Sequence, residues 1–138
     1  MQGRTGESMG SQIILVVEDE VLIRMLVAEI LRDKGYQVVE AACGDEGVAI
    51  LLSGQVVDLI ITDVRMPGQI DGVALATYSK TANPVRPVVI MSTHLPATDA
   101  AIADEFISKP YVPSMLLRAI DKLIGQPWHI PPRNQSVL

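Results

Sequence analysis

The stretch ILVVEDE, residues 14–20, joins a run of apolar residues directly to three carboxylates. The full apolar run QIILVV (12–17) is rich in β-branched residues, which is typical of a strand covered on both faces. Three adjacent acids at the end of a buried strand repel one another, and burial adds to the cost of their charge. Glu18, Asp19 and Glu20 therefore predict a compensating cation close to this strand end.

Strand-like and helix-like segments alternate along the rest of the chain. The patterns predict strands at 12–17, 36–41, 57–62, 87–91 and 105–108, and helices at 20–34, 45–54, 72–81 and 113–124. The apolar residues expected to be buried in the two longest helices are Leu22, Ile23, Leu26, Val27, Ile30 and Leu31, and Met115, Leu116, Ala119, Ile120, Leu123 and Ile124. The alternation implies βαβ units, and hence a parallel sheet with helices on both faces.

Length and composition limit the class of protein. A chain of 138 residues, 49% hydrophobic and 20% charged, fits one folded domain. We expect a flexible leader at 1–11, the domain at 12–125 and a proline-rich tail at 126–138, in which Trp128 packs back on the domain or is loosely ordered. No apolar run is long enough for a membrane helix.

Charge and cysteine content exclude further classes. The net charge of −5 and the lack of a Lys/Arg cluster argue against nucleic-acid binding. Cys43 is the only cysteine, which rules out an internal disulfide and fits a reducing cytoplasm. Because neither histidine is near it in sequence, Cys43 is interpreted as a small core or loop residue and not as a nucleophile.

Acidic residues follow two strands that are neighbours in the expected strand order 2-1-3-4-5. Glu18 and Asp19 follow the first strand, and Asp63 follows the third. These two strands meet where the strand order reverses, which is where ligands bind in open α/β sheets. Three converging carboxylates suit Mg²⁺ better than zinc, which prefers nitrogen and sulfur ligands. Glu20 is interpreted as a first-turn helix acid that the helix dipole favours.

The remaining two strands also end in polar residues. Ser92 ends the fourth strand, and Lys109, followed by Pro110, ends the fifth. Their side chains should face the carboxylates across the crevice. Carboxylates, a magnesium site, a hydroxyl and a lysine together suit phosphoryl chemistry, because each can hold an oxygen of a transferring phosphoryl group.

These motifs resemble the receiver domain of two-component response regulators. The resemblance rests on Glu18-Asp19, Asp63, Met66-Pro67, Ser92 and Lys109-Pro110, in this order at successive strand ends, and covers roughly residues 12–125. Each motif alone is weak, whereas the ordered set is highly specific. The resemblance implies a flavodoxin-like, doubly wound, five-stranded parallel sheet.

The resemblance also implies a role for each acid. Asp63 would be the phospho-acceptor, attacking a phosphohistidine on a histidine kinase or histidine phosphotransfer protein. Asp19 and Asp63 would bind Mg²⁺ directly, together with the backbone carbonyl of Arg65, and Glu18 would reach the ion through water. Without the resemblance, Asp63 is interpreted as a helix-initiating or turn-initiating acid.

Three further residues gain roles in the same way. Lys109 would pair with phosphoryl oxygens, Ser92 would hydrogen-bond the bound phosphoryl group, and Phe106 would be the rotating aromatic of a switch. The simpler interpretations are a solvated lysine, a loop hydroxyl and a core phenylalanine. Thr93 competes with Ser92 as the hydroxyl donor.

Three features depart from the commonest receiver pattern. The segment MPGQIDG (66–72) is one residue longer than in many family members. Arg65 and His94 flank the pocket, where they either steer or block an attacking water or are simply exposed residues at its rim. Ser92 and Lys109 are only 17 positions apart. Common receivers have about five more, which is more than one helical turn. A shortened or irregular fourth helix is therefore expected.

The predicted function is that of a phosphorylation-switched signalling protein, resembling a stand-alone, single-domain response regulator. It would catalyse only its own phosphorylation and dephosphorylation and would signal by protein contact, because about 14 residues after the last helix are too few for an output domain. One alternative is a receiver-like adaptor that works without phosphate, and another is a receiver excised from a hybrid kinase. A third is a Mg²⁺-dependent aspartyl-phosphate phosphatase, which usually has a second acid where this chain has Arg65.

Overall fold

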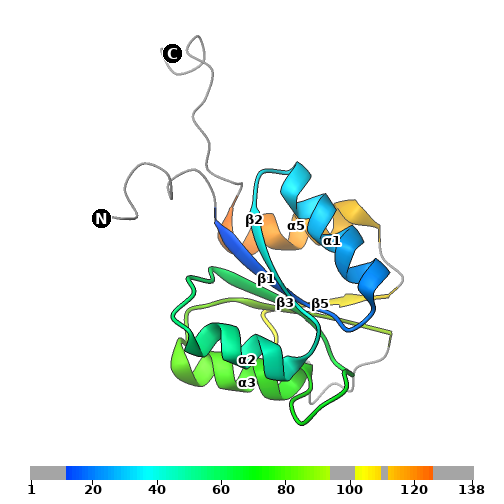
Figure 1. The fold of residues 1–138 in the computed structure, drawn as a ribbon. Coiled ribbons are helices and arrows are strands. Elements are labelled where there is room, and N and C mark those ends of the chain that lie inside the picture. Colours follow the sequence, from blue (N-terminus) through cyan, green and yellow to red (C-terminus); the bar gives the residue numbers. More distant parts are fainter. Residues whose placement is uncertain (1–11, 94–101, 110–111, 126–138) are drawn as a thin grey trace.

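The computed structural model describes residues 12–93, 102–109 and 112–125. The strands are β1 (Ile13–Val17), β2 (Gln37–Ala41), β3 (Leu59–Asp63), β4 (Val88–Ser92) and β5 (Glu105–Ser108). The helices are α1 (Val21–Asp33), α2 (Gly44–Leu52), α3 (Gly72–Ala82) and α5 (Pro113–Ile124) (Figure 1). The expected leader and tail, with Trp128, and most of the expected fourth helix, with His94, lie outside the described residues.

All strand pairs are parallel, and the strand order is β2-β1-β3-β4-β5. Helices α1 and α5 cover one face of the sheet, and α2 and α3 cover the other (Figure 1). This confirms the predicted α/β class and strand order. No helix among the described residues is long and apolar enough to cross a membrane.

The continuous apolar strands are explained by their coverage on both faces. In β1, Ile14 and Val16 pack on the α1/α5 side, whereas Leu15 and Val17 pack on the α2/α3 side. All four are fully buried. Burying a side chain of this size stabilises the fold by about 1.5–3 kcal/mol, so a polar residue at any of these positions would be costly.

The ends of several elements differ from the sequence prediction by one or two residues. Asp63 is the last residue of β3 and does not follow it, because it still pairs with Met91. Ser92 ends β4, as predicted, whereas Lys109 follows β5, which ends at Ser108. Helix α2 ends at Leu52. Gly54 follows with φ of +89°, a left-handed conformation that glycine adopts at low cost after a helix.

The predicted buried faces of two helices were partly wrong. Leu22 is 80% exposed and Leu26 is 54% exposed, and α1 instead buries Val27, Ala28 and Leu31. In α5, Met115 is 42% exposed. The apolar stripe is wider than the contact with the sheet, and periodicity alone does not show which edge of a stripe faces solvent.

Tyr36 connects the start of β2 to the end of α5. Its ring is 4% exposed, and its hydroxyl donates a hydrogen bond to the carbonyl of Gly125 (3.0 Å). Burial, assisted by the negative charge of Asp121, raises the pKa of Tyr36 to about 12. The folded chain therefore keeps the phenolic proton at pH values where the unfolded chain loses it.

This proton linkage gives a pH-dependent prediction for Tyr36→Phe. Because the folded pKa is raised, the stabilising contribution of Tyr36 is fully present below about pH 10 and is lost as pH rises toward 12. At pH 8 the wild type should be more stable by about 1 kcal/mol, from the hydrogen bond. Urea unfolding at pH 8 and pH 11 measures the difference, which should shrink at the higher pH. An equal difference in unfolding free energy at pH 8 and pH 11 would contradict the raised pKa of Tyr36.

Candidate functional site

Three carboxylates meet at the carboxyl edge of the sheet. Glu18 and Asp19 lie in the turn between β1 and α1, and Asp63 ends β3. One ligand oxygen from each lies within 4.8 Å of the others. Glu18 is fully buried, Asp63 is half-buried and Asp19 is exposed. The convergence predicted from strand order is therefore present, and we call these three residues the acidic crevice.

Lys109 joins two members of the acidic crevice. Its ammonium lies 3.1 Å from Glu18 Oε1 and 3.3 Å from Asp63 Oδ2. The backbone N–H of Lys109 donates to the carbonyl of Ser92 (2.9 Å), which keeps the end of β5 beside the end of β4. This lysine supplies part of the positive charge that the clustered acids of residues 18–20 require.

Burial and pairing shift the proton affinities of this ion pair. Burial is the largest influence on Glu18 and raises its pKa, and the charge of Asp63 adds to the rise, although a hydrogen bond from the Glu20 N–H and the pairing with Lys109 oppose it. For Lys109, burial alone would lower the pKa. The hydrogen bond to Glu18 and the charge of Asp63 outweigh it, so the pKa is raised and the ammonium stays protonated.

A cavity of about 440 Å³ opens beside the acidic crevice. Its lining residues come from the carboxyl ends of β3, β4 and β5 and from the start of α1, and they are Glu20, Ile23, Asp63, Arg65, Ser92, Thr93 and Lys109. Ser92 is 6% exposed and Thr93 is exposed. Because both line the cavity, the choice between them as the hydroxyl donor stays a prediction.

Glu20 differs from its sequence interpretation. It is the N-cap residue of α1 and lies before the first turn, which contains no acid. Its side chain makes no capping hydrogen bond, and its backbone N–H donates to Glu18 Oε2 (3.1 Å). Glu20 therefore belongs both to the start of α1, as its N-cap, and to the wall of the cavity.

The loop after β3 is held closely behind Asp63. Asp63 Oδ1 accepts a hydrogen bond from the backbone N–H of Val64 (2.7 Å), and Gly72 N–H donates to the carbonyl of Val64 (2.7 Å). A Cβ atom at Gly72 would lie only 1.9 Å from the carbonyl oxygen of Asp63. Only glycine therefore fits at this position without moving the candidate acceptor.

Asp45 at the start of α2 anchors the same loop and was not identified from the sequence. Its Oδ1 accepts a hydrogen bond from the backbone N–H of Ile70 (3.1 Å). Gly68, with φ of +103°, lies against the Asp45 carboxylate. The Gly68 turn and this anchor hold the segment 66–72, which was predicted to be one residue longer than usual.

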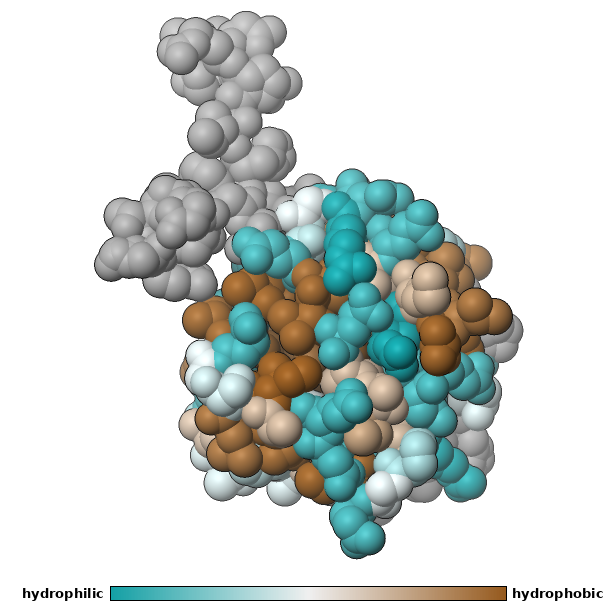
Figure 2. All heavy atoms as spheres, viewed as in Figure 1, coloured by the Kyte–Doolittle hydropathy of each residue, from teal (hydrophilic) through white to brown (hydrophobic). Residues whose placement is uncertain are grey.

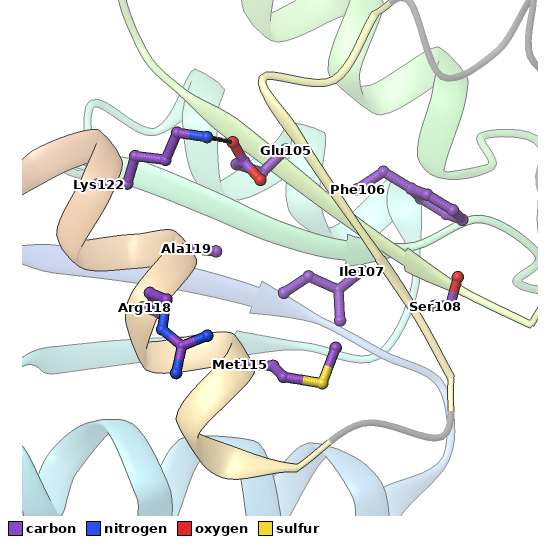
Figure 3. Close-up of a pocket in the computed structure, with 8 residues that line it drawn as sticks. All are labelled: Glu105, Phe106, Ile107, Ser108, Met115, Arg118, Ala119 and Lys122. Atoms are coloured by element: carbon purple, nitrogen blue, oxygen red, sulfur yellow. Dashed lines mark ion pairs between the residues drawn. The ribbon is translucent and has the colours of Figure 1, made fainter.

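Phe106 and Ile107 point to opposite faces of β5. Figure 3 shows Ile107 directed toward α5, beside a groove of about 360 Å³, and Phe106 directed away from it. Phe106 packs against apolar residues of the α2/α3 side and is half-buried. This position agrees with a core residue and also leaves the ring near the carboxyl edge, so its switching role stays a prediction.

Cys43 takes no part in the acidic crevice or in the cavity beside it. It is the half-buried N-cap residue of α2, in extended conformation, with a free thiol. Its position agrees with the interpretation of a loop residue.

A family model for the response regulator receiver domain matches residues 14–121. The chain is 34% identical over 118 residues to the transcriptional regulatory protein GlrR of Escherichia coli K12, covering 82% of this chain and 26% of that protein. It is 36% identical over 120 residues to the transcriptional regulatory protein PdtaR of Mycobacterium tuberculosis, covering 82% of this chain and 57% of that protein. The chain thus matches only part of these longer regulators.

Solved structures agree with the family match. The response regulator protein TrrA of Thermotoga maritima, in complex with Mg²⁺-BeF, superposes with a TM-score of 0.76 at 30% identity, covering 82% of this chain and 99% of that chain. A CheY-like receiver domain protein of Methanospirillum hungatei superposes with a TM-score of 0.75 at 26% identity, covering 81% of this chain and 92% of that chain.

The fold and the acidic edge are those of a receiver domain with a flavodoxin-like architecture. With the matched sequence model, they show that this chain belongs to the response regulator receiver domain family. Family membership is consistent with phosphorylation-switched signalling and does not favour the alternatives of a phosphate-independent adaptor or a phosphatase.

The Lys109 ion pairs give a stability prediction. Lys109→Met leaves Glu18 buried beside Asp63 without its cation, which should destabilise the protein by about 2–3 kcal/mol at neutral pH. Lys109 lowers the pKa of Glu18, so its loss raises that pKa further. An acid with a raised pKa in the folded state destabilises the fold when it ionises, so stability is lost as pH rises. The difference in unfolding free energy between wild type and Lys109→Met should therefore grow from pH 5 to pH 8.

Urea unfolding in a metal-free buffer with chelator measures this deficit. The matched control is Glu18→Gln/Lys109→Met, which removes the uncompensated acid together with the lysine. It should recover part of the stability at pH 8 and show a weaker pH dependence. A Lys109→Met deficit that is constant from pH 5 to pH 8 would show that Glu18 does not depend on the lysine.

Proposed function

We propose that this receiver domain is switched by phosphorylation of Asp63. The observation that supports the proposal is the Asp63 carboxylate, half-buried at the wall of a 440 Å³ cavity with Lys109 3.3 Å away. A carboxylate oxygen of Asp63 attacks phosphorus, a new P–O bond forms, and the P–N bond of a phosphohistidine breaks. The imidazole leaves with the bonding electron pair and takes up a proton.

Mg²⁺ is the proposed cofactor. The acidic crevice offers only oxygen ligands, and Lys109 is the only cation that forms ion pairs with it within the described ranges. Two negative charges are left over when the three acids are ionised, which suits a hard divalent ion. Asp19, Asp63 and the carbonyl of Arg65 would hold the ion directly, and Glu18 through water. The bound ion would neutralise charge on the phosphoryl oxygens.

The other site residues receive distinct proposed roles. Lys109 pairs with a phosphoryl oxygen, which places its ammonium where charge accumulates during transfer. Ser92, at the end of β4, donates a hydrogen bond to the bound phosphoryl group. Phe106 is the aromatic residue of the switch, and its ring rotates when this hydrogen bond forms. The chain then catalyses only its own phosphorylation and dephosphorylation.

A protein donor is favoured by the surface beside the cavity. Four apolar side chains of α1 are more than half exposed, namely Val21, Leu22, Met25 and Leu26, at 54%, 80%, 56% and 54%. Figure 2 shows apolar residues gathered over the part of the surface where α1 lies. Such a patch is typical of a protein contact. We propose a histidine kinase or histidine phosphotransfer protein as the donor.

The output is proposed to be contact with another protein in the cytoplasm. The acidic composition disfavours nucleic acid as a direct partner of this domain. An adaptor that works without phosphate would have no need for Lys109 between Glu18 and Asp63. A phosphatase would need a second acid near the nucleophile, where Arg65 lies exposed.

Chemical phosphorylation tests the acceptor. With acetyl phosphate and Mg²⁺, the wild type should gain one phosphoryl group by intact-protein mass spectrometry, and Asp63→Asn should gain none. The matched control is Asp71→Asn, because Asp71 caps α3 through the N–H of Ala74 (2.8 Å) and asparagine caps equally well. Labelling of Asp63→Asn to the wild-type level would exclude Asp63 as the acceptor.

Titration calorimetry with Mg²⁺ tests the metal ligands. Asp19→Asn should weaken binding by at least about tenfold, because it removes a charged ligand. Glu20→Gln removes the same charge from the next residue and should have a smaller effect, since Glu20 is not part of the acidic crevice. A weaker affinity in Glu20→Gln than in Asp19→Asn would reverse the assignment.

A further inference from the structure

Arg24 in α1 reaches back to the turn that carries the acids. Its Nη1 donates a hydrogen bond to the backbone carbonyl of Glu18 (2.7 Å), six residues earlier in the chain. Only 16% of the Arg24 side chain is exposed. A short, largely buried hydrogen bond from a charged donor is among the stronger kinds in proteins. Arg24 therefore fixes the direction of the Glu18 carbonyl.

The Arg24 guanidinium is itself held from the opposite side. Its Nε lies 3.4 Å from Glu40 Oε1 on β2. The other oxygen of Glu40 lies 3.2 Å from Arg32, which is 50% exposed and also donates to the carbonyl of Val38. Both arginines thus use the same carboxylate, and only Arg24 extends from it to the turn between β1 and α1.

Little else fixes Asp19 in this turn. Among the described residues, the Asp19 carboxylate takes part in no hydrogen bond or ion pair, so its position depends on its backbone. The preceding Glu18 N–H is fixed by the carbonyl of Ala41 (3.0 Å), and the following Glu20 N–H by Glu18 Oε2 (3.1 Å). The peptide unit between Glu18 and Asp19 is planar, and its oxygen is the atom that Arg24 holds.

We infer that Arg24 is a positioning residue for the metal site, because it orients the Glu18–Asp19 peptide and so places the Asp19 carboxylate beside Asp63. The inference rests on the proposed Mg²⁺ site and adds a residue that touches neither the ion nor the phosphoryl group. Supporting residues behind metal ligands commonly change metal affinity by about 10–100-fold. Without Arg24, the exposed Asp19 samples more orientations, and ordering it costs part of the binding free energy.

Arg24→Met and Arg32→Met form a matched pair for the test. Both remove one positive charge and one partner of Glu40 from the same helix, but only the first frees the Glu18 carbonyl. By titration calorimetry, Arg24→Met should bind Mg²⁺ about tenfold more weakly, whereas Arg32→Met should stay within about twofold of the wild type. Arg24→Lys keeps a donor and should fall between them. Unfolding curves verify that each variant is folded at the titration temperature.

Hydrogen exchange without metal provides a second readout. The Glu20 amide, which donates to Glu18 Oε2, should exchange faster in Arg24→Met than in the wild type or Arg32→Met. Wild-type Mg²⁺ affinity in folded Arg24→Met, or an equal loss in both methionine variants, would overturn the inference while leaving the metal site intact. A wild type that binds no Mg²⁺ would instead refute the proposed site, and with it this role for Arg24.

Discussion

The contact of one ammonium with two carboxylates determines what this structure can do. Lys109 lies within ion-pair distance of both Glu18 and Asp63, which come from different strand ends. Without it, a fully buried acid would lie beside a second acid, and no other cation in the described part of the chain pairs with either. Burial makes such charges expensive, and the pairing keeps the crevice assembled before any metal or phosphoryl group arrives. The ends of β1, β3 and β5 therefore depend on one another.

The parallel sheet makes this contact possible. The central strands β1, β3 and β4 are buried on both faces, so there only the strand ends can display charged side chains, and all carboxyl ends of the parallel sheet lie at one edge. This is why much of the site could be predicted from the sequence. Strand order places Glu18, Asp19 and Asp63 together, and Ser92 at the end of β4 and Lys109 directly after β5 are then brought to the same edge. The continuous apolar runs of β1 and β4 indicate strands covered on both faces, which is typical of a parallel sheet between two layers of helices.

Other features could not be predicted, because they depend on partners distant in sequence. The exposure of Leu22 and Leu26 depends on which edge of α1 meets the sheet. Arg24 has the pattern of an ordinary surface residue of a helix, and its contacts with the Glu18 carbonyl and with Glu40 on β2 arise only when these three segments are folded together. Asp45 likewise has the sequence pattern of a first-turn helix acid, and its hydrogen bond from the β3–α3 loop is visible only in the folded structure. Periodicity describes a helix, but not what packs on it.

The central claim is that the acidic crevice and Lys109 form one phosphoryl-accepting site. A crystal structure with Mg²⁺ and beryllofluoride, a phosphoryl mimic, tests this most directly. We expect beryllium bonded to a carboxylate oxygen of Asp63, the metal held by Asp19 and Asp63, and the Lys109 ammonium moved from Glu18 and Asp63 onto a fluorine. Beryllofluoride bound at another residue, or Lys109 still paired with Glu18 and Asp63 around an occupied site, would contradict it.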